Sequence, residues 1–321
     1  MTRSAKLSSS QVDAFRSSLL RWYAQNKRDL PWRKTRDPYR IWISEIMLQQ
    51  TRVAAVLEHY QEFLRRFPAV HKLAAADEAC VLAAWSGLGY YRRARNLHAA
   101  AKRVVHEHGS NLPRGSTDWR ELPGIGRYTA AAIASIAFGE PVAVLDGNVE
   151  RVLHRVRGEA QTKRDAWSSA QFLLDPDSPG DYNQAMMELG ATVCLPRDPR
   201  CELCPIRKFC RTQGPGGLSS QKQGLQKRSI SYGLETRAQS VRMVRRSPRV
   251  SLMPGMWELP QVRSRRSDAL LFSLSHSITT SRFTVTVFGG AAHGRWVRVS
   301  QLKTLPLTGL ARKILRIARI M

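Results

Sequence analysis

The chain has 321 residues and carries 51 lysine and arginine side chains against 25 aspartate and glutamate, a formal net charge of +26. It contains no apolar run long enough to cross a bilayer, which excludes a protein that spans a membrane by helices. So large a positive excess favours a nucleic-acid partner, although general basicity or solubility would account for part of it.

Residues 8–212 are expected to form an all-helical domain. Val12, Phe15 and Leu19 recur at helical spacing after Ser8 and Gln11, which stand in a capping-box pattern. The same periodicity predicts a helix around residues 43–57 and further helices near residues 77–85, 92–107, 128–138 and 147–157. No convincing run of strands separates these segments.

Glu45 is a carboxylate inside the apolar segment Trp42-Ile-Ser-Glu-Ile-Met-Leu-Gln-Gln50. An acid in such surroundings keeps its proton to a higher pH than in water, as a proton donor near neutrality must. Glu45 could equally lie on a polar helix face with Gln49 and Arg52, because the spacing fits both interpretations.

The segment Leu122-Pro-Gly-Ile-Gly-Arg127 precedes an alanine-rich helix. Gly124 and Gly126 would turn the chain tightly and expose backbone N–H groups at a helix N-terminus, which suits phosphate binding. An ordinary turn between helices also uses glycine. Together with the basic charge, the segment predicts the hairpin of a helix-hairpin-helix DNA-binding element.

Asp146 stands immediately before a helical pattern that includes Val149, Val152 and Val156. Aspartate is among the best N-cap residues, so a capping role is the stronger interpretation of Asp146 considered alone.

Four cysteines stand as C-x6-C-x2-C-x5-C, at Cys194, Cys201, Cys204 and Cys210, while Cys80 lies elsewhere. Their clustering favours a metal site over buried or disulfide-paired cysteines. Zinc and a 4Fe-4S cluster both accept four thiolates, and the spacing leaves both open.

A linker is predicted over residues 213–230, because the chain after Cys210 is rich in Gly, Ser and Gln without apolar periodicity. Residues 211–321 hold 20 basic and 3 acidic side chains, whereas residues 1–210 hold 31 and 22. The alternating segment Phe283-Thr-Val-Thr-Val-Phe288 and a helical pattern over residues 310–320 predict an α+β domain over residues 231–321.

These motifs, in order along residues 8–210, resemble the adenine DNA glycosylase (MutY) branch of the endonuclease III superfamily. The resemblance is carried by the cysteine spacing, the two motifs around Glu45 and Gly124, and Leu30-Pro-Trp-Arg33, Trp85-Ser-Gly-Leu-Gly-Tyr-Tyr-Arg-Arg-Ala-Arg-Asn-Leu97, Val144-Leu-Asp-Gly-Asn-Val149 and Asn183-Gln-Ala-Met-Met-Glu-Leu-Gly190.

The resemblance implies that the four cysteines hold a 4Fe-4S cluster rather than zinc. It implies that Glu45 protonates adenine at N7 and then helps to activate water. Asp146 would stabilise the positive charge that develops on the sugar or bond to the sugar transiently, and Asn148 would position one or both carboxylates, as in other glycoside hydrolyses. A cap and a catalytic role are compatible at Asp146.

Tyr128 occupies the position where related lyases carry a lysine, and a phenol cannot form a Schiff base. The resemblance therefore implies a monofunctional glycosylase. It also assigns Gln49 and Tyr90 as wedges inserted into the duplex, although a surface amide and a packed ring are simpler alternatives. Glu188 and Arg33 would line the adenine pocket.

Two C-terminal segments resemble the Nudix-like domain of this family, Leu252-Met-Pro-Gly-Met-Trp-Glu-Leu-Pro260 and Leu307-Thr-Gly-Leu-Ala-Arg-Lys-Ile-Leu315. No cluster of carboxylates follows Pro260, so a binding module is expected rather than a second enzyme. The family reads 8-oxoguanine through a Phe-Ser-His element. Here Leu274, Ser275 and His276 match it, with leucine replacing the aromatic, and His276 could also be a simple polar turn residue.

The expected function is removal of adenine mispaired with 8-oxoguanine or guanine in double-stranded DNA, as the base-excision step of DNA repair. We expect a monomer that acts in the cytoplasm with the nucleoid and has no membrane partner. The alternatives are a bifunctional endonuclease III-like glycosylase/lyase and a non-catalytic DNA-binding iron-sulfur protein.

Overall fold

The computed structural model describes residues 7–214, 226–250, 253–263, 269–278, 281–290 and 293–321. The chain divides into two compact units, one formed by Met1–Gln49 with Arg103–Ser220 and the other by Gln50–Lys102 with Gln221–Met321. The helical region over residues 8–212 is thus shared between two units. The division depends on contacts between segments far apart in sequence, which hydrophobic periodicity does not report.

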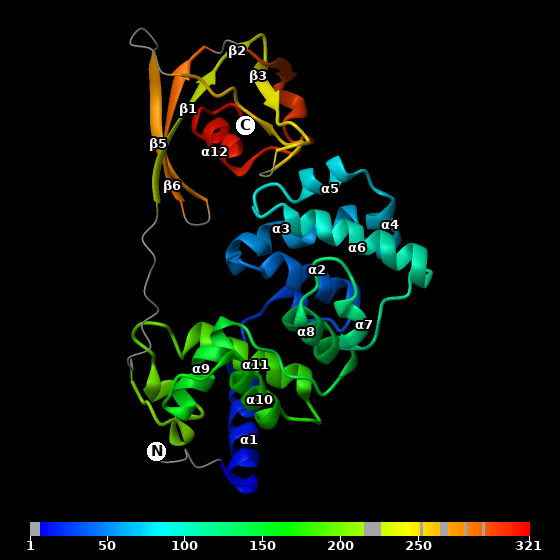
Figure 1. Ribbon diagram of the computed structural model, residues 1–321, viewed down its shortest axis with the longest axis vertical. Helices are drawn as coiled ribbons and strands as arrows, with labels where there is room; N and C mark the ends of the chain where they lie inside the picture. The colour runs from blue at the N-terminus through cyan, green and yellow to red at the C-terminus, as the bar shows by residue number, and fades with distance from the viewer. Residues whose placement is uncertain (1–6, 215–225, 251–252, 264–268, 279–280, 291–292) are drawn as a thin grey trace. The chain divides into compact units, whose positions relative to one another are not determined.

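The first unit is helical and is built around α11 (Pro179–Thr192), which packs against α1 (Ser9–Asn26), α8 (Arg127–Phe138) and α9 (Gly147–Arg157) (Figure 1). The helix α2 (Pro38–Leu48) packs on α8, and α7 (Ser116–Arg120) also contacts α8. Trp42 of α2 and Trp119 of α7 meet edge to face in this core, with ring centroids 5.3 Å apart. The remaining elements are α10 (Lys163–Leu173) and the short 3-10 helices η1 (Pro31–Arg33), η2 (Cys201–Leu203) and η3 (Arg207–Phe209).

The capping box predicted at Ser8 and Gln11 is present, but the helix predicted around residues 43–57 is interrupted, because α2 ends at Leu48 and the next helix is α3 (Val53–Arg66). Ser8 Oγ accepts a hydrogen bond from the Gln11 N–H at 3.3 Å, and Gln11 Oε1 accepts one from the Ser8 N–H at 2.9 Å, which completes the capping box of α1. The helices expected near residues 128–138 and 147–157 are α8 and α9, and those near 77–85 and 92–107 are α5 (Glu78–Ala84) and α6 (Arg92–His108).

The second unit contains α3 (Val53–Arg66), α4 (Val70–Ala75), α5, most of α6 and the C-terminal strands. In one sheet the order is β1-β6-β5: β1 (Gln226–Leu234) runs parallel to β6 (Ser281–Gly289), and β5 (Leu270–Ile278) runs antiparallel to β6. In the other, β3 (Ser240–Arg245) pairs antiparallel with β2 (Thr236–Arg237), β4 (Trp257–Glu258) and β7 (Arg295–Arg298). After the 3-10 helix η4 (Val299–Gln301) comes α12 (Gly309–Ile317), whose Ile314 joins Val241, Val285 and Val287 in the core.

The boundary between the predicted linker and the C-terminal domain differs from the prediction. The strand β1 begins at Gln226, inside the range expected to be linker. Its first residues are polar and exposed, so they carry no apolar alternation. Backbone pairing with β6 from Gln226↔Ser281 onwards makes them a strand nonetheless. Residues 215–225 of the predicted linker, and Leu252 of the predicted C-terminal signature, lie outside the described residues.

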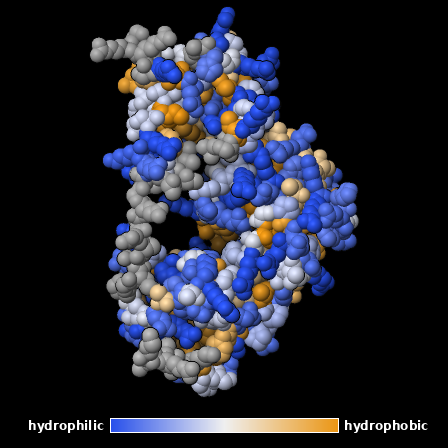
Figure 2. Space-filling view, viewed as in Figure 1, coloured by the Kyte–Doolittle hydropathy of each residue, from blue (hydrophilic) through white to orange (hydrophobic). Residues whose placement is uncertain are grey.

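The surface agrees with the high charge of the sequence. On the face drawn in Figure 2, hydrophilic residues predominate and hydrophobic ones form scattered patches. Across the described ranges, no helix is both long enough and apolar enough to cross a bilayer.

Candidate active site

Glu45 lies in the buried middle of α2. Asp37 caps this helix by accepting hydrogen bonds from the backbone N–H groups of Tyr39 at 2.8 Å and Arg40 at 3.4 Å, and Pro38 opens its first turn. The turns that follow are buried on all sides, Glu45 included. The polar-face interpretation of Glu45 is therefore wrong, because the helix has no solvated face at this residue.

The Glu45 carboxyl group meets the phenol of Tyr128, from the first turn of α8. The Tyr128 hydroxyl is 3.1 Å from Glu45 Oε2 and 3.1 Å from the Met187 sulfur. The pKa of Glu45 is raised to about 7, chiefly by burial and also by the charge of Asp146, against the lowering effects of the Tyr128 hydrogen bond and the Arg33 charge. Near neutral pH this side chain can therefore both donate and accept a proton.

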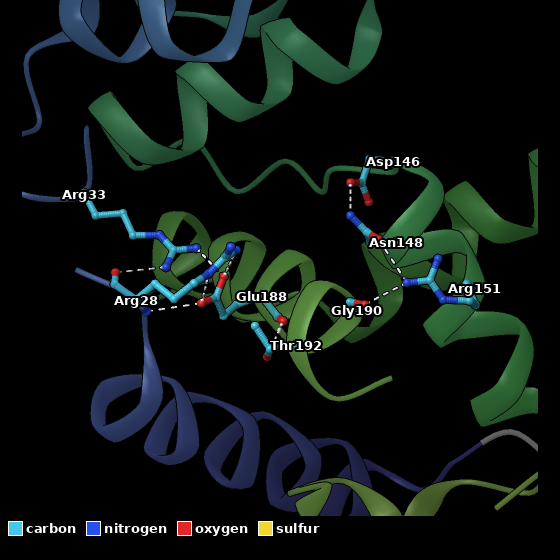
Figure 3. Close-up of polar contacts among 8 residues, drawn as sticks. All are labelled: Arg28, Arg33, Asp146, Asn148, Arg151, Glu188, Gly190 and Thr192. Carbon is cyan, nitrogen blue, oxygen red and sulfur yellow. Dashed lines mark hydrogen bonds and ion pairs between the residues drawn. The ribbon is translucent and has the colours of Figure 1, made fainter. Parts of the chain in front are cut away.

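Asp146 is the N-cap of α9, as its position in the sequence predicts. Its Oδ2 accepts a hydrogen bond from Asn148 Nδ2 at 3.0 Å (Figure 3). Its Oδ1 accepts one from the Val149 N–H at 2.7 Å. Burial raises the pKa of Asp146, while these two hydrogen bonds oppose the rise by stabilising the anion. The cap and Asn148 thus fix both carboxylate oxygens of a residue that interacts electrostatically with Glu45.

Arg151 holds Asn148 in the orientation that Asp146 requires. Arg151 Nη2 donates to Asn148 Oδ1 at 2.9 Å and to the Gly190 carbonyl at 2.7 Å (Figure 3). Arg151 Nε donates to the Cys194 carbonyl at 2.9 Å. Because the amide oxygen faces Arg151, the amide nitrogen faces Asp146. Gly190 of α11 lies close to Asn148 of α9, and only glycine fits there. A Cβ on residue 190 would lie 2.6 Å from the Cβ of Asn148.

Glu188 is fully buried and is held by two arginines. Arg28 donates from Nε to Oε1 at 2.7 Å and from Nη2 to Oε2 at 2.6 Å, and Arg33 Nη2 donates to Oε2 at 2.8 Å (Figure 3). Burial acts to raise the pKa of Glu188, but the hydrogen bonds from Arg28 and Arg33 outweigh it and lower the pKa to about 2. Both carboxylate oxygens are occupied, so this anion positions Arg33 near Glu45.

The predicted hairpin joins α7 to α8. Gly124 has φ 78°, in the left-handed region that favours glycine, and Leu122 and Ile125 are buried beneath the turn. Gly126 is the N-cap of α8, and within the described residues no side chain caps that helix. Gly124, Gly126 and Arg127 are exposed, so the start of α8 is accessible from solvent.

The two predicted wedge residues lie in different units. Gln49 follows α2 and donates from Nε2 to Thr129 Oγ1 at 3.1 Å. Tyr90 belongs to the second unit, where it has φ 48° and an exposed fraction of 43%. An exposed tyrosine with left-handed backbone conformation is not a core residue, so the packing alternative for Tyr90 is wrong.

Ser275 and His276 lie on β5 and pair with Thr284 and Phe283 of β6. Successive side chains of a strand point to opposite faces, so the two cannot meet one ligand face while β5 stays extended. Ser275 is exposed, whereas His276 is partly buried on the face of Leu274, which packs against the core. Burial and then the charge of Lys313 lower the pKa of His276.

All four clustered cysteines are free thiols and line one small cavity together with Arg155. Arg155 Nη1 donates to Cys194 Sγ at 3.2 Å, and the Arg155 carbonyl accepts from Cys210 Sγ at 3.3 Å. Within the described ranges, no three His, Cys, Asp or Glu side chains converge as ligands of one metal ion. A shared cavity lined by four thiols suits a thiolate-bound metal group, and the buried guanidinium of Arg155 would offset its negative charge.

Three arginines of the site, Arg28, Arg151 and Arg155, were not identified from the sequence. Asn148, Arg151 and Arg155 are spaced by three and four residues, so the helical pattern placed them on one face of α9. Arg28 lies between α1 and η1, where no periodicity signals its role.

Residues 43–172 match the family described as HhH-GPD superfamily base excision DNA repair protein. A human protein named adenine DNA glycosylase is 49% identical over 63% of this chain and 40% of its own length. A relative of the same name from Buchnera aphidicola subsp. Schizaphis graminum is 38% identical over 62% of this chain and 59% of its own. The chain thus spans less than two thirds of these curated relatives.

Solved structures with the same fold include a thermostable thymine-DNA glycosylase, with a TM-score of 0.60, 31% identity, and coverage of 64% of this chain and 97% of that one. A non-covalent complex of endonuclease III with DNA aligns with a TM-score of 0.57 at 21% identity, over 65% of this chain and 97% of that one, which shows a shared fold. The chain belongs to the HhH-GPD superfamily of base-excision DNA-repair proteins.

Proposed function

We propose that the chain is a monofunctional adenine DNA glycosylase of base-excision repair. Its substrate is adenine opposite 8-oxoguanine or guanine in double-stranded DNA, and its product is an abasic site in an intact strand. The observation that carries the proposal is the buried Glu45 carboxyl group, with a pKa of about 7, in electrostatic contact with Asp146. A proton donor beside an anion suits cleavage of a glycosidic bond.

Each carboxyl group has a separate task in this proposal. Adenine leaves its sugar poorly, so Glu45 donates a proton to N7 as the bond breaks and then accepts one from the attacking water. Asp146, whose anion is stabilised by Val149 N–H and Asn148, stabilises the positive charge that develops at C1′. Asn148 and Arg151 position Asp146 for that role.

Tyr128 is the residue that limits the reaction to hydrolysis of the glycosidic bond and leaves the DNA strand intact. Its phenol shares a hydrogen bond with Glu45 and provides no amine for a Schiff base. It helps to hold the Glu45 carboxyl group in place.

DNA would be held by backbone amides and by arginine and lysine side chains. The open N-terminus of α8 after Gly124 and Gly126 suits a phosphate. Extruding the adenine costs a few kcal/mol of unstacking, and Gln49 and Tyr90 would each act as a wedge inserted beside the orphaned partner base. Arg33, positioned by Glu188, would face the adenine pocket.

The C-terminal strands and α12 form the part that we assign to reading the base opposite adenine, as a Nudix-like module. Ser275 is the better placed of the two predicted contacts, because it is exposed on β5. His276 points to the opposite face of β5, so it could contact the same base only if the strand changed its conformation locally. Leu274 packs inward and offers no stacking surface to a base.

We assign a 4Fe-4S cluster to Cys194, Cys201, Cys204 and Cys210, supported by their free thiols and shared cavity. The cluster orders the loop that carries it. Five exposed basic side chains on or beside this loop would then face DNA phosphates: Arg197, Arg200, Arg207, Lys208 and Arg211.

The activity is tested on a duplex with one 8-oxoguanine:A pair, in single-turnover reactions with and without alkaline strand scission. Wild-type protein should give strand breaks after alkali alone, and Glu45→Gln and Asp146→Asn should each lose about 10²- to 10⁴-fold in rate with duplex affinity retained. The exposed Glu58→Gln serves as the matched control.

Strand breaks without alkali would contradict the monofunctional assignment. Preferential release of thymine from a G:T duplex would contradict the substrate. Binding without any base release would favour the non-catalytic alternative.

Burial of Glu45 also predicts how stability depends on pH. Its folded-state pKa of about 7 exceeds the ordinary value of 4.5, so its contribution is fully present below pH 4.5 and is lost as pH rises through 7. Glu45→Gln removes the buried charge and should raise the free energy of unfolding by about 1–3 kcal/mol at pH 8, but by less than about 1 kcal/mol at pH 5. Urea denaturation at both pH values measures this, and an equal effect at both would refute it.

The cluster is tested by analysing purified protein for iron, acid-labile sulfide and zinc. About four iron and four sulfide per chain are expected, with both reduced in Cys204→Ser and unchanged in Cys80→Ser, whose cysteine is exposed and outside the loop. Stoichiometric zinc with no sulfide would show that the site is a zinc site.

A further inference from the structure

The guanidinium of Arg93, in the first turn of α6, connects two loops of the second unit. Its Nη2 donates to the carbonyls of Leu88 and Gly89, each at 3.2 Å, and to Thr51 Oγ1 at 2.9 Å. Residues 86–91, called here the Tyr90 loop, include both carbonyls. Thr51 belongs to the turn after α2, and its hydroxyl also lies 3.5 Å from the Leu88 carbonyl.

The Tyr90 loop has a backbone that needs outside support. Gly87, Gly89 and Tyr90 all have left-handed φ values, of 116°, 69° and 48°. Glycine accepts such angles at little cost, but tyrosine does not, so the conformation at Tyr90 persists only where neighbouring contacts fix it. Arg93 supplies such contacts to the two carbonyls just before Tyr90, and Trp85 Nε1 donates to the Gly89 carbonyl at 3.1 Å.

Arg93 also contacts the Tyr90 ring itself. Its guanidinium carbon lies 5.5 Å from the centroid of the Tyr90 ring and 5.3 Å from that of the buried Trp85 ring. Burial lowers the pKa of Arg93 to about 10, so the group remains a cation at neutral pH and both contacts are cation–π interactions. The Tyr90 ring is thus supported from within the protein and still exposed to solvent.

The same cation supports the turn that follows Gln49. Gln50 has φ 55°, another left-handed value in a residue other than glycine, and Thr51 comes next. The hydrogen bond from Arg93 to Thr51 fixes the end of this turn. One planar side chain with several fixed donors can hold both loops and stack on two rings, which the single charge of lysine cannot do.

We propose that Arg93 is a positioning residue that presets the Tyr90 loop and the turn after Gln49, so that the Tyr90 ring is ready to enter the base stack. The inference rests on the proposed function, because it takes Tyr90 as the wedge. The inference separates two steps, the opening of the base pair and the cleavage of the glycosidic bond. Loss of Arg93 should impair opening of the base pair and spare the bond cleavage that follows.

The experiment compares Arg93→Met and Arg93→Lys with Lys102→Met, a control at an exposed residue of the same helix. One duplex carries 2-aminopurine in place of the target adenine opposite 8-oxoguanine, and its fluorescence reports unstacking. Two further duplexes measure single-turnover excision, one with adenine opposite 8-oxoguanine and one with adenine opposite an abasic site, where no partner base holds it. Thermal unfolding of each variant shows that it is folded.

Arg93→Met should reduce the fluorescence rise and lower excision from the paired duplex about 10- to 100-fold, but by less than about 3-fold from the abasic duplex. Arg93→Lys should fall between wild type and Arg93→Met, and Lys102→Met should match wild type. Equal losses on the two duplexes, or an unchanged fluorescence rise, would overturn the role of Arg93. A wild type that removes no adenine from either duplex would overturn the proposed function instead.

Discussion

The carboxyl group of Glu45 is removed from water by the residues packed around α2, and this burial raises its pKa to about 7. A carboxyl group in water would have lost its proton well below neutral pH and could not serve as an acid there. The two neighbours of Glu45 act in opposite directions. The Asp146 charge favours the protonated form and the Tyr128 hydroxyl favours the anion. Their opposed effects help to keep the pKa of Glu45 near neutral pH.

The polar network around this pair fixes groups that would otherwise be mobile. Arg151 orients Asn148, and Asn148 orients Asp146, while the same guanidinium reaches the carbonyl of Cys194. The cysteine loop is therefore connected to the Asp146 carboxylate by hydrogen bonds, although nothing in the proposed chemistry requires an electron from it. On the other side, Glu188 holds Arg28 and Arg33, which places a cation within electrostatic range of Glu45.

Much of this arrangement could be predicted from the sequence, because its signals are local. The capping box at Ser8, the cap at Asp146 and the glycines of the hairpin each act within a few residues. What could not be predicted depends on distant partners. Tyr128 lies far from Glu45 in the chain, and the polar start of β1 becomes a strand only because β6 pairs with it. The opposed directions of Ser275 and His276 depend on the pairing of β5 with β6 in register at these residues, which a local pattern does not report.

The most direct test of the account is the pH dependence of single-turnover adenine excision. If the protonated Glu45 is the acid, the rate should fall by up to about tenfold per pH unit above pH 7. Tyr128→Phe removes a hydrogen bond that lowers the pKa, so it should move this fall to higher pH. A rate that is constant or rising between pH 6 and 9, or a Tyr128→Phe profile shifted to lower pH, would contradict the assignment of Glu45 as the buried proton donor.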